Sequence, residues 1–534
     1  MVMSKHIFIF LFIIGALCLY GCTDDFATRI NLDENTSGGE FNSDAALYGT
    51  IQDNYGKPVA GVLVSDGIQT TETDAEGNYQ LFSDLTLRRF VFITIPAGYE
   101  VPSKNGIPQF WQRISAAEKQ FKADFMLMKR TRTDDRYTIL MTADPQIRAR
   151  SAGTDQYLFH SIDIYEDMCT DMKELAATIS NRPVYSICLG DMVHNNMSLW
   201  EDYCNGIKDF SFPVFHVIGN HDHIQNAASD DLAVAEYEKY LGPTNYAVDL
   251  GQLHYIFLDD INMKDNSALA SSATGAYQNG LSDETLEWLR GHLAHVDKSK
   301  MLMVCAHSSL YKKIDYNPSS TDLNATAYTN LFSGYKYVHS WAGHQHYHFN
   351  YVYAAEETGS RFANVESHIL GRSTGMLGLN ASINSCGTPR GYMVIEVEGE
   401  NISWYYKPCN YEEGKTLNLT KEYQIRAYYP GELDPGNGVY YSDRRVYANV
   451  WNHDAYWGPV YYTDNGKTKV AMTKGTTYDG YANYLYFLYK DQYTVLEKSS
   501  TPHMFSIEPS AGATSATIET TDRFGNHYTA DISW

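Results

Sequence analysis

The sequence predicts an α/β domain with an all-β domain on either side of it. Apolar strand patterns alternate with helical patterns between about residues 131 and 390, which is typical of a sheet covered by helices on both faces. Short strands separated by turn residues precede this region, and strand patterns without helices follow it. A chain of 534 residues has room for about three domains of this kind.

Composition restricts the classes of partner. The chain has 41 Lys and Arg against 64 Asp and Glu, a net charge of -23, so its surface repels nucleic-acid backbones. We therefore expect no nucleic acid polymer as a partner. A local metal-lined pocket could still bind an anionic substrate.

The N-terminus has the pattern of a processing signal. Lys5 precedes an apolar run over residues 7–19 that is too short for a comfortable membrane span. The residues 19–22, Leu-Tyr-Gly-Cys, resemble a bacterial lipobox, which implies a lipoprotein signal over residues 1–22 with Cys22 lipidated. An ordinary cleaved signal peptide is the alternative. We expect residues 23–45 to be a flexible tether, because they are polar and rich in Gly, Ser and Asn.

This N-terminus predicts a location outside the cytoplasm. The protein would be an outer-membrane or cell-surface lipoprotein, or periplasmic, and would touch the membrane only through its N-terminal lipid anchor. Beyond the signal region the chain has six cysteines with no CxxC pairing, so no zinc ribbon is indicated and any disulfide is left unassigned.

Residues 46–130 predict an antiparallel β-sandwich, since alternating apolar residues are separated by Asp, Asn and Gly turns. The pattern resembles a carboxypeptidase-regulatory-like or Ig-like sandwich. Asp53 and Asp74 raise the question of a calcium site. We favour turns, because Asp side chains cap turns with their own carboxylates.

Residues 131–390 form the predicted α/β domain. A polar helix is expected over residues 161–180, and Ser282 is expected to cap a helix that places Leu286, Leu289 and Leu293 on one face. The expected strands contain residues 139–141, 184–189, 213–218, 253–258, 302–305 and 337–341. Residues 391–534 predict a C-terminal β-sandwich domain that begins with a hairpin over residues 392–406.

Polar residues of the types that bind metals follow five of these strands. In sheet-centred α/β folds, ligands bind outside the carboxyl ends of the strands. A single residue of this type usually belongs to a turn or has a structural role. Polar side chains that converge from five strand ends, however, would be costly to bury unless cations bound them. These residues are Asp144, Asp191, Asn220, His307, His344 and His346. The sequence therefore predicts a metal site.

The order of these motifs, DxQ, GD, GNHD, H and GHxH, resembles the calcineurin-like metallophosphoesterase superfamily from Tyr137 to Val397. This resemblance implies a central β-sandwich flanked by helices in α-β-β-α layers. The outer domains are similar to the N- and C-terminal companions found in a bacterial subfamily.

The resemblance also implies roles for individual residues. Asp144 and His346 would bind a first metal, with Gln146 beside them where many members have His. Asp191 would bridge two metals, and a second metal would be bound by Asn220, His307 and His344. His221 would protonate the leaving oxygen or hold the phosphate, and Asp222 would orient His221.

The ligand types suit two divalent or transition metal ions such as Mn, Fe or Zn, which would supply a hydroxide for in-line attack. His194 and Asn195 stand where many members have an Asp. Weaker candidates near the motifs are Arg148, His223 and His348, and Asp259 and Asp260 end a strand without an assigned role.

The predicted function is metal-dependent hydrolysis of a phosphodiester, phosphomonoester or pyrophosphate, in a phosphorylated small molecule or a lipid or glycan. One alternative is a catalytically inactive phosphoesterase scaffold that serves as a surface binding lipoprotein. Another is an adhesion or glycan-binding lipoprotein, which the 43 tyrosines permit. Retention of all the metal-type residues together with His221 favours the enzyme.

Overall fold

The computed structural model describes residues 42, 44–149, 161–264, 277–311, 322–379, 382–412, 414–464, 469–492 and 496–534. All of them belong to one compact unit. The expected signal peptide, Cys22 and most of the tether lie outside the described residues. Among the helices that the structure does describe, none is long and apolar enough to span a membrane.

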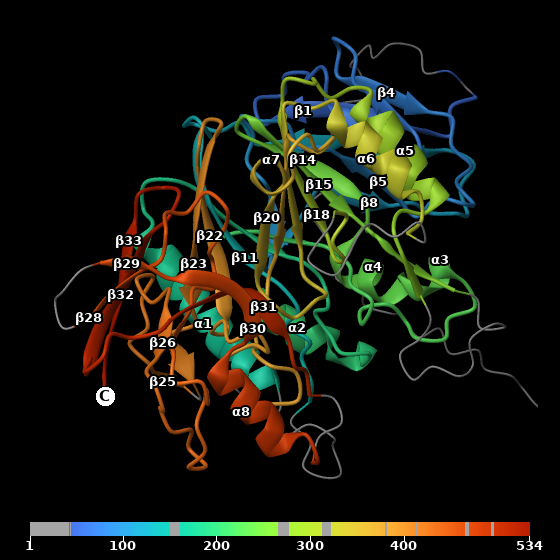
Figure 1. Ribbon diagram of the computed structural model, residues 1–534. Helices are drawn as coiled ribbons and strands as arrows, with labels where there is room; N and C mark the ends of the chain where they lie inside the picture. The colour runs from blue at the N-terminus through green and yellow to red at the C-terminus, as the bar shows by residue number, and fades with distance from the viewer. Residues whose placement is uncertain are drawn as a thin grey trace, which may run out of the picture. The chain divides into compact units, whose positions relative to one another are not determined.

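Two sheets form the centre of the fold (Figure 1). The first has the order β13 (Val214–His216), β12 (Val184–Cys188), β11 (Arg136–Thr142), β22 (Gly391–Glu398), β23 (Asn401–Pro408). The second has the order β14 (Tyr246–Leu250), β15 (Leu253–Leu258), β18 (Met301–Ala306), β19 (Tyr337–Ala342), β21 (Val365–Ile369), β20 (Phe349–Val352). The strands β11, β12 and β13 are parallel, as are β15, β18, β19 and β21.

The two sheets pack face to face, because side chains of the first sheet alternate between two apolar cores. Ile139 and Met141 of β11 face the core shared with the second sheet, whereas Leu140 faces a separate core beneath the helices. Phe215 of the first sheet stacks on Phe257 of the second, with ring centroids 5.3 Å apart.

Helices cover the outer faces of this sandwich. The core around Leu140 contains residues of α1 (Ser161–Thr178) and α2 (Trp200–Ile207). Helix α5 (Asp283–Leu293) and α6 (Ala325–Ser333) pack with the second sheet. The predicted α-β-β-α layers are thereby confirmed. The shorter helical segments are η1 (Met197–Leu199), α3 (Asp230–Ala233), α4 (Ala235–Leu241) and α7 (Tyr353–Glu356), and a small hairpin joins β16 (Ile261–Met263) to β17 (Tyr277–Asn279).

The predicted cap of α5 is confirmed. The Ser282 hydroxyl accepts a hydrogen bond from the Thr285 amide at 3.0 Å, and Leu286, Leu289 and Leu293 are all buried. The cap satisfies one of the free amides of the first turn, and the leucine face supplies the burial that holds the helix on the sheet.

The hairpin at residues 391–408 differs from its predicted place. We expected it to open the C-terminal domain, but β22 pairs with β11 in antiparallel register from Arg136↔Glu398 to Met141↔Met393. The hairpin therefore extends the central sheet, whereas the two sheets of the C-terminal sandwich are formed by strands from β26 onward. Alternating apolar residues indicate a strand but do not say which sheet it joins.

The N-terminal domain is a small sandwich. One sheet contains β10 (Phe125–Leu127), β1 (Leu47–Asp53), β4 (Asn78–Leu81) and β9 (Phe121–Lys122); the other contains β3 (Thr70–Glu72), β2 (Leu63–Ser65), β5 (Phe90–Ile93) and β8 (Trp111–Arg113). A further hairpin joins β6 (Ser103–Lys104) to β7 (Ile107–Pro108).

Asp53 and Asp74 form turns in this domain. Asp53 accepts hydrogen bonds from the amides of Tyr55 and Lys57 at 2.8 and 2.9 Å. Asp74 accepts one from Asn78 at 2.8 Å. These contacts agree with the turn interpretation of both residues.

The C-terminal domain is a second sandwich. Its sheets are β26 (Arg426–Tyr428), β27 (Val446–Asn449), β31 (Ser500–Ile507), β30 (Thr473–Tyr478) and β29 (Val470–Ala471), β28 (Tyr461–Asp464), β32 (Ser515–Thr521), β33 (His527–Ser533). The short hairpin of β24 (Tyr411–Glu412) and β25 (Lys415–Thr416) precedes them.

Helix α8 (Gly480–Tyr489) was not expected from the sequence. Its tyrosines favour strands by propensity, but the Asp479 carboxylate accepts a hydrogen bond from the Ala482 amide at 3.0 Å and so caps a helix. Ala482 and Leu485 pack on a small cluster with Met376 and Ile383. Capping and tertiary contacts therefore override the propensity.

The six cysteines of the described chain are free thiols, so the possible disulfide is not formed among them. Most are buried, and burial raises the pKa of Cys169 and Cys188 to about 12. These two act as small apolar residues in the core beneath α1.

An ion pair joins the C-terminal domain to the central sheet. Arg523 donates to both carboxylate oxygens of Glu366, at 2.6 and 2.9 Å, and Tyr337 donates to the same carboxylate at 2.7 Å. Burial opposes ionisation of Glu366, but the hydrogen bonds from Arg523 lower its pKa to about 2.

Two buried histidines beside Glu366 complete this joint. Their positions with Glu366 would fit a metal ion, but hydrogen bonds already use the facing atoms. His339 Nδ1 lies 3.2 Å from His368 Nε2, and His368 Nδ1 lies 2.8 Å from the Asn350 oxygen. Burial lowers the pKa of His339 to about 4, so it is neutral. The Arg523 guanidinium provides the positive charge that Glu366 requires.

Replacing Arg523 tests this joint. Arg523→Ala should lower the free energy of unfolding by about 3 kcal/mol at pH 7, because the Glu366 carboxylate is left buried without its partner. The ordinary pKa of Glu is about 4.3. The stabilisation of wild type is therefore complete above that pH and is lost as the pH falls toward 2. The gap between wild type and variant should shrink over that interval, as measured by urea unfolding.

The matched control is Lys469→Ala, which removes an exposed ion pair with Glu519 in the same domain. Its cost should stay below about 1 kcal/mol at pH 7. If the two variants lose the same free energy of unfolding, Arg523 contributes no more than a surface charge does.

Candidate metal centre

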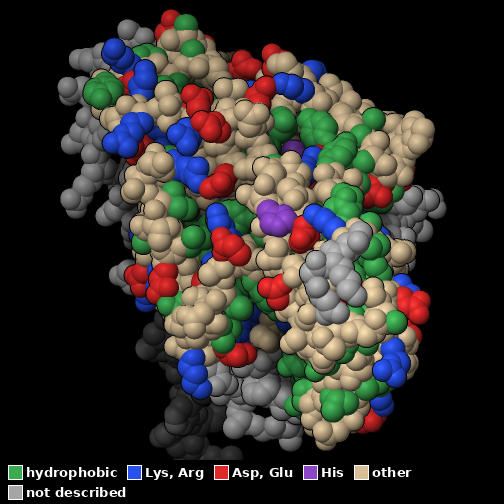
Figure 2. Space-filling model, turned by 60° about the vertical axis from the view of Figure 1, so that its left-hand side comes forward, with side chains coloured by type: hydrophobic (Ala, Val, Ile, Leu, Met, Phe, Trp, Pro, Cys, Tyr) green, Lys and Arg blue, Asp and Glu red, His purple; other side chains and the backbone are tan. Residues whose placement is uncertain are grey.

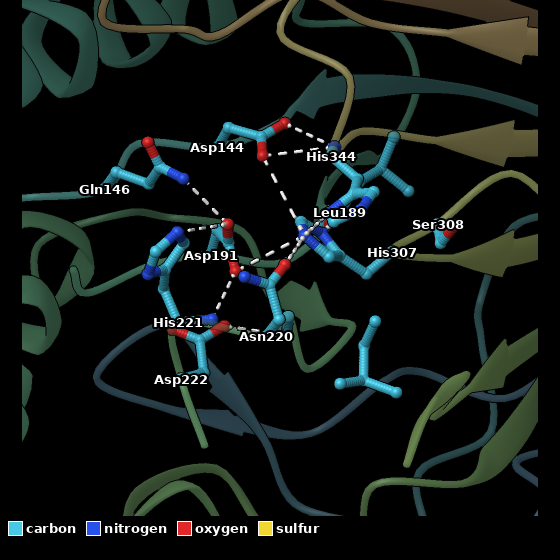
Figure 3. A network of polar contacts seen from close by, with 12 residues as sticks. Asp144, Gln146, Leu189, Asp191, Asn220, His221, Asp222, His307, Ser308 and His344 are labelled. Carbon is cyan, nitrogen blue, oxygen red and sulfur yellow. Dashed lines mark hydrogen bonds and ion pairs between the residues drawn. The ribbon is translucent and has the colours of Figure 1, made fainter. Parts of the chain in front are cut away.

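The structure brings the seven predicted ligands together at the carboxyl ends of the strands, and all of them except His346 are labelled in Figure 3. Asp144 and Gln146 follow β11, and Asp191 follows β12. Asn220 comes after β13, His307 directly after β18, and His344 and His346 after β19. Parallel strands that end at one edge of a sandwich account for this convergence.

Five of these residues have a left-handed backbone, with φ between 41° and 65°: Asp144, Gln146, Asp191, His344 and His346. Such a conformation costs a non-glycine residue about 1–2 kcal/mol. Conformations of this kind gather at functional sites, where the surrounding structure holds them. Here the left-handed residues lie in the turns that follow β11, β12 and β19.

Glycines beside the ligands make room for them. A Cβ at Gly219 would lie 2.2 Å from the Asp191 carboxylate, and one at Gly343 would lie 2.4 Å from that of Asp144. Any larger residue at either position would displace a carboxylate. This explains the glycines of the GN and GH motifs.

One ligand cluster surrounds His307 Nε2, which lies 3.3 Å from Asp191 Oδ1, 3.2 Å from Asn220 Oδ1 and 3.2 Å from His344 Nδ1. The other ring nitrogen, Nδ1, donates to the Leu189 carbonyl at 2.8 Å. A neutral His307 therefore turns a lone pair, not a hydrogen, toward the cluster. Several lone pairs face one another there.

A second ligand cluster surrounds His346 Nε2, which lies 3.4 Å from Asp144 Oδ1 and 3.1 Å from the Gln146 amide nitrogen. That nitrogen is also 2.8 Å from Asp191 Oδ2. The Gln146 oxygen is buried and has no hydrogen-bond partner among the described residues. A half-turn of the amide exchanges the two atoms and directs the oxygen to the cluster.

Both clusters have the spacing of metal ligands. Atoms that lie about 2.1 Å from one cation are about 3.0–3.4 Å apart, which matches the distances around His307 and His346. Burial disfavours a charged imidazole, yet the Asp191 carboxylate raises the pKa of His307 to about 10, and Glu497 and Asp144 raise that of His346 to about 9. The pocket therefore favours positive charge at the positions where metals would bind.

Asp191 connects the two clusters. Its Oδ1 faces His307 and its Oδ2 faces Gln146. The His221 amide donates to Oδ1 at 2.8 Å and holds the carboxylate in this orientation. Burial opposes ionisation of Asp191, but His307 keeps its pKa well below the usual range. A carboxylate that presents one oxygen to each cluster is suited to bridge two cations.

His221 is oriented by a residue other than the one we expected. The sequence assigned this role to Asp222, but the Asp222 carboxylate accepts hydrogen bonds from the amides of Val193 and Gly219, at 3.0 and 2.8 Å. The His221 Nδ1 atom lies 2.8 Å from the Asn195 oxygen instead. Asp222 thus holds the loops together, and Asn195 fixes the ring.

The remaining ring nitrogen of His221 faces the centre. Nε2 lies 4.0 Å from Asp191 Oδ2, and the His194 ring stacks on the other side at a centroid distance of 4.3 Å. Burial lowers the pKa of His221, and the Asp191 charge opposes this effect. The floor of the site is almost fully buried, whereas His221 and His344 are partly exposed and form its rim.

Two carboxylates that support the ligands were not predicted from the sequence. Asp260, which had no assigned role, accepts hydrogen bonds from the amides of His307 and Ser308, both at 3.0 Å. Glu497 of the C-terminal domain contacts His346 Nδ1. Asp260 at least follows a strand, but no feature of a single sequence links Glu497 to a histidine 151 positions away.

The weaker candidates have structural contacts. His223 Nδ1 lies 2.8 Å from the Gly219 carbonyl, and His348 Nε2 lies 3.1 Å from the Asn452 oxygen. Arg148 is close enough to His194 to help lower its pKa, although burial has the larger effect.

On the face shown in Figure 2, acidic and basic side chains are interspersed.

Three family profiles match consecutive parts of the chain. The profile described as calcineurin-like phosphoesterase matches residues 137–348. Those described as the N terminal and the C terminal of calcineurin-like phosphoesterase match residues 45–130 and 372–528. No curated protein sequence gives a match.

Several solved structures are similar at low identity. A dimetal phosphatase from Danio rerio is 13% identical over 51% of this chain and 95% of its own, with a TM-score of 0.36. A purple acid phosphatase from yellow lupin (Lupinus luteus) is 14% identical over 67% and 68%, with a TM-score of 0.37. A 5'-nucleotidase from Candida albicans is 14% identical over 51% and 52%, with a TM-score of 0.30.

The profiles cover the α/β domain and both sandwiches, and the strand ends within them carry the converging ligands. The chain belongs to the calcineurin-like phosphoesterase family, with that family's N-terminal and C-terminal domains on either side of its phosphoesterase domain.

Proposed function

We propose that this protein is a hydrolase of phosphoric esters that uses two divalent metal ions. The observation that carries the proposal is the pair of ligand clusters that share Asp191, one around His346 and one around His307. When bound, two cations of the Mn, Fe or Zn type would activate water and neutralise the phosphoryl oxygens. Asp144, Gln146 and His346 would hold one, and Asn220, His307 and His344 the other.

The residues around the clusters have distinct tasks in this proposal. His221 lies at the rim, with Nε2 directed at the centre and Nδ1 held by Asn195. It would contact the bound phosphate and donate a proton to the oxygen of the leaving group. Asp260 and Leu189 fix the backbone and the ring of His307, so that the ligand geometry exists before substrate arrives.

The proposed substrate is a phosphorylated small molecule, including the head group of a lipid or glycan. The ligands on the floor of the site are buried, so the reacting phosphate must be exposed on the substrate. The net charge of -23 makes a nucleic acid polymer a poor substrate.

Asp191→Asn tests the bridging role. The change removes one negative charge and one oxygen ligand, so Mn²⁺ affinity should fall by more than 100-fold, beyond the 10- to 100-fold effect of a supporting residue. Two Mn²⁺ per chain are expected in wild type and fewer than one in the variant, as measured by equilibrium dialysis with elemental analysis. Asp74→Asn, in the N-terminal turn, is the matched control and should bind like wild type. Full occupancy in Asp191→Asn would contradict the shared centre.

His221→Ala tests the proton donor. Metal content should be unchanged while hydrolysis of p-nitrophenyl phosphate or bis-p-nitrophenyl phosphate falls by about 10²–10⁴ in kcat. The loss should be greater with phenyl phosphate, because phenolate is the more basic leaving group and needs the proton more. An equal loss of kcat with p-nitrophenyl phosphate and phenyl phosphate would contradict the role of His221 as an acid and leave it only a role in phosphate binding.

Asn195 provides a graded test of the same site. Asn195→Gly suits the left-handed backbone, where φ is 57°, but removes the oxygen that holds His221. We expect a loss of about tenfold in kcat, well below that of His221→Ala. Asn195→Asp keeps an acceptor and should stay near wild type. If Asn195→Gly has full activity, another contact orients His221.

We also propose that the protein acts outside the cytoplasm and is anchored through lipidated Cys22. The support is the apolar run over residues 7–19 followed by the lipobox-like residues 19–22. Cys22→Ala should move the protein from the membrane fraction to the soluble extracytoplasmic fraction. Cys18→Ala, inside the apolar run, is the control and should leave fractionation unchanged. Membrane association of Cys22→Ala would overturn the lipid anchor.

A further inference from the structure

The Glu497 side chain of the C-terminal domain contacts one of the candidate metal ligands, His346. Glu497 lies just before β31, and its Oε1 atom accepts a hydrogen bond from His346 Nδ1. The Glu497 side chain is 28% exposed and that of His346 is 11% exposed, so solvent screens the pair only in part.

This contact decides which nitrogen of His346 faces the ligand cluster. Because Nδ1 carries the hydrogen shared with Glu497, the lone pair of a neutral ring is on Nε2, which points at Asp144 and Gln146. The other Glu497 oxygen is buried and has no hydrogen-bond partner within the described part of the chain. A carboxylate that is half satisfied in this way is costly unless the group it contacts is charged or holds a cation.

The main chain around the two residues is also connected. Ser499 lies 2.8 Å from Ser385 through their hydroxyl groups, and the Ser385 hydroxyl is 3.4 Å from the His346 carbonyl. Asn452 of the C-terminal domain contacts His348, two residues further on. The loop that carries His346 is therefore held by the C-terminal domain at several points.

In the other cluster, the supports of His307 come from the phosphoesterase domain. The ring of His307 is fixed by Leu189, and its backbone by Asp260. Both partners lie within residues 137–348, and neither is in the C-terminal domain. The two halves of the centre thus have different supports.

We propose that Glu497 is a positioning residue for the metal at His346, and that the C-terminal domain thereby completes this half of the centre. The inference rests on the proposed two-metal centre and adds a residue outside the phosphoesterase domain to it. A carboxylate partner fixes the tautomer of a metal-binding histidine and makes its ligand nitrogen more basic.

The test is a titration of the full-length chain with Mn²⁺ alone. Calorimetry and electron paramagnetic resonance measure the binding at the two sites. In Glu497→Ala, affinity at the site of His346 should fall 10- to 100-fold, while affinity at the site of His307 stays as in wild type. The signal of a coupled Mn pair should then appear only at a higher Mn²⁺ concentration. Glu497→Gln keeps the hydrogen-bond acceptor without its charge and should lose only a few-fold.

The matched control is Glu508→Ala, an exposed carboxylate just past β31, which should titrate like wild type. If Glu497→Ala does not fold, Glu497→Gln, which has the same shape, provides the measurement. Wild-type affinity at both sites in both Glu497 variants would overturn the inference, and so would equal weakening of both sites, which indicates a general structural role. A wild-type chain that binds no Mn²⁺ would instead overturn the proposed function.

Discussion

The arrangement of the candidate site depends on the burial of two carboxylates, those of Asp144 and Asp191. Both carboxylates are almost completely buried. Ring nitrogens of His307 and His346, the Gln146 amide nitrogen and backbone N–H groups lie next to them, and the other ligand atoms close by are acceptors. Burying such a group of acceptors is unfavourable unless cations or protons lie between them. The raised pKa values of His307 and His346 express the same demand for positive charge. The left-handed turns, the supporting carboxylates and the glycines all serve to keep these atoms in place.

The fold meets this demand through its topology. Parallel strands from two sheets end at one edge, so that residues more than 200 positions apart can surround the same point. The cost of the bent backbone at five ligands is offset by the packing of the sandwich below them, where alternate residues of β11 fill two separate cores. The ion pair of Glu366 and Arg523 holds the C-terminal domain on this sandwich, and Glu497 of the same domain contacts the ligand His346.

Much of this arrangement could be predicted from the sequence, because its signals are local. Apolar runs identified the strands β11, β12, β15 and β18, Ser282 identified the start of α5, and the polar residues at the strand ends identified six of the side chains that the structure brings together. The seventh, Gln146, was identified through the resemblance of the motifs to a known family. Pairing partners are not a local property. The strands of the hairpin β22 and β23 were therefore recognised, but the pairing of β22 with β11 was not.

The same reason explains the errors within the site. Asp222 follows His221 directly and was the expected partner for its ring, but its carboxylate accepts hydrogen bonds from the amides of Val193 and Gly219. Asn195 takes its place from another strand end. Glu497 belongs to a different domain, and only the folded chain shows that it contacts His346.

Anomalous X-ray scattering from crystals grown with Mn²⁺ would show whether two cations share Asp191. We expect two peaks about 3.5–4 Å apart. One should lie among Asp144, Gln146, Asp191 and His346, and the other among Asp191, Asn220, His307 and His344. A single peak, or a peak at His339, Glu366 and His368 in place of these two, would contradict this expectation.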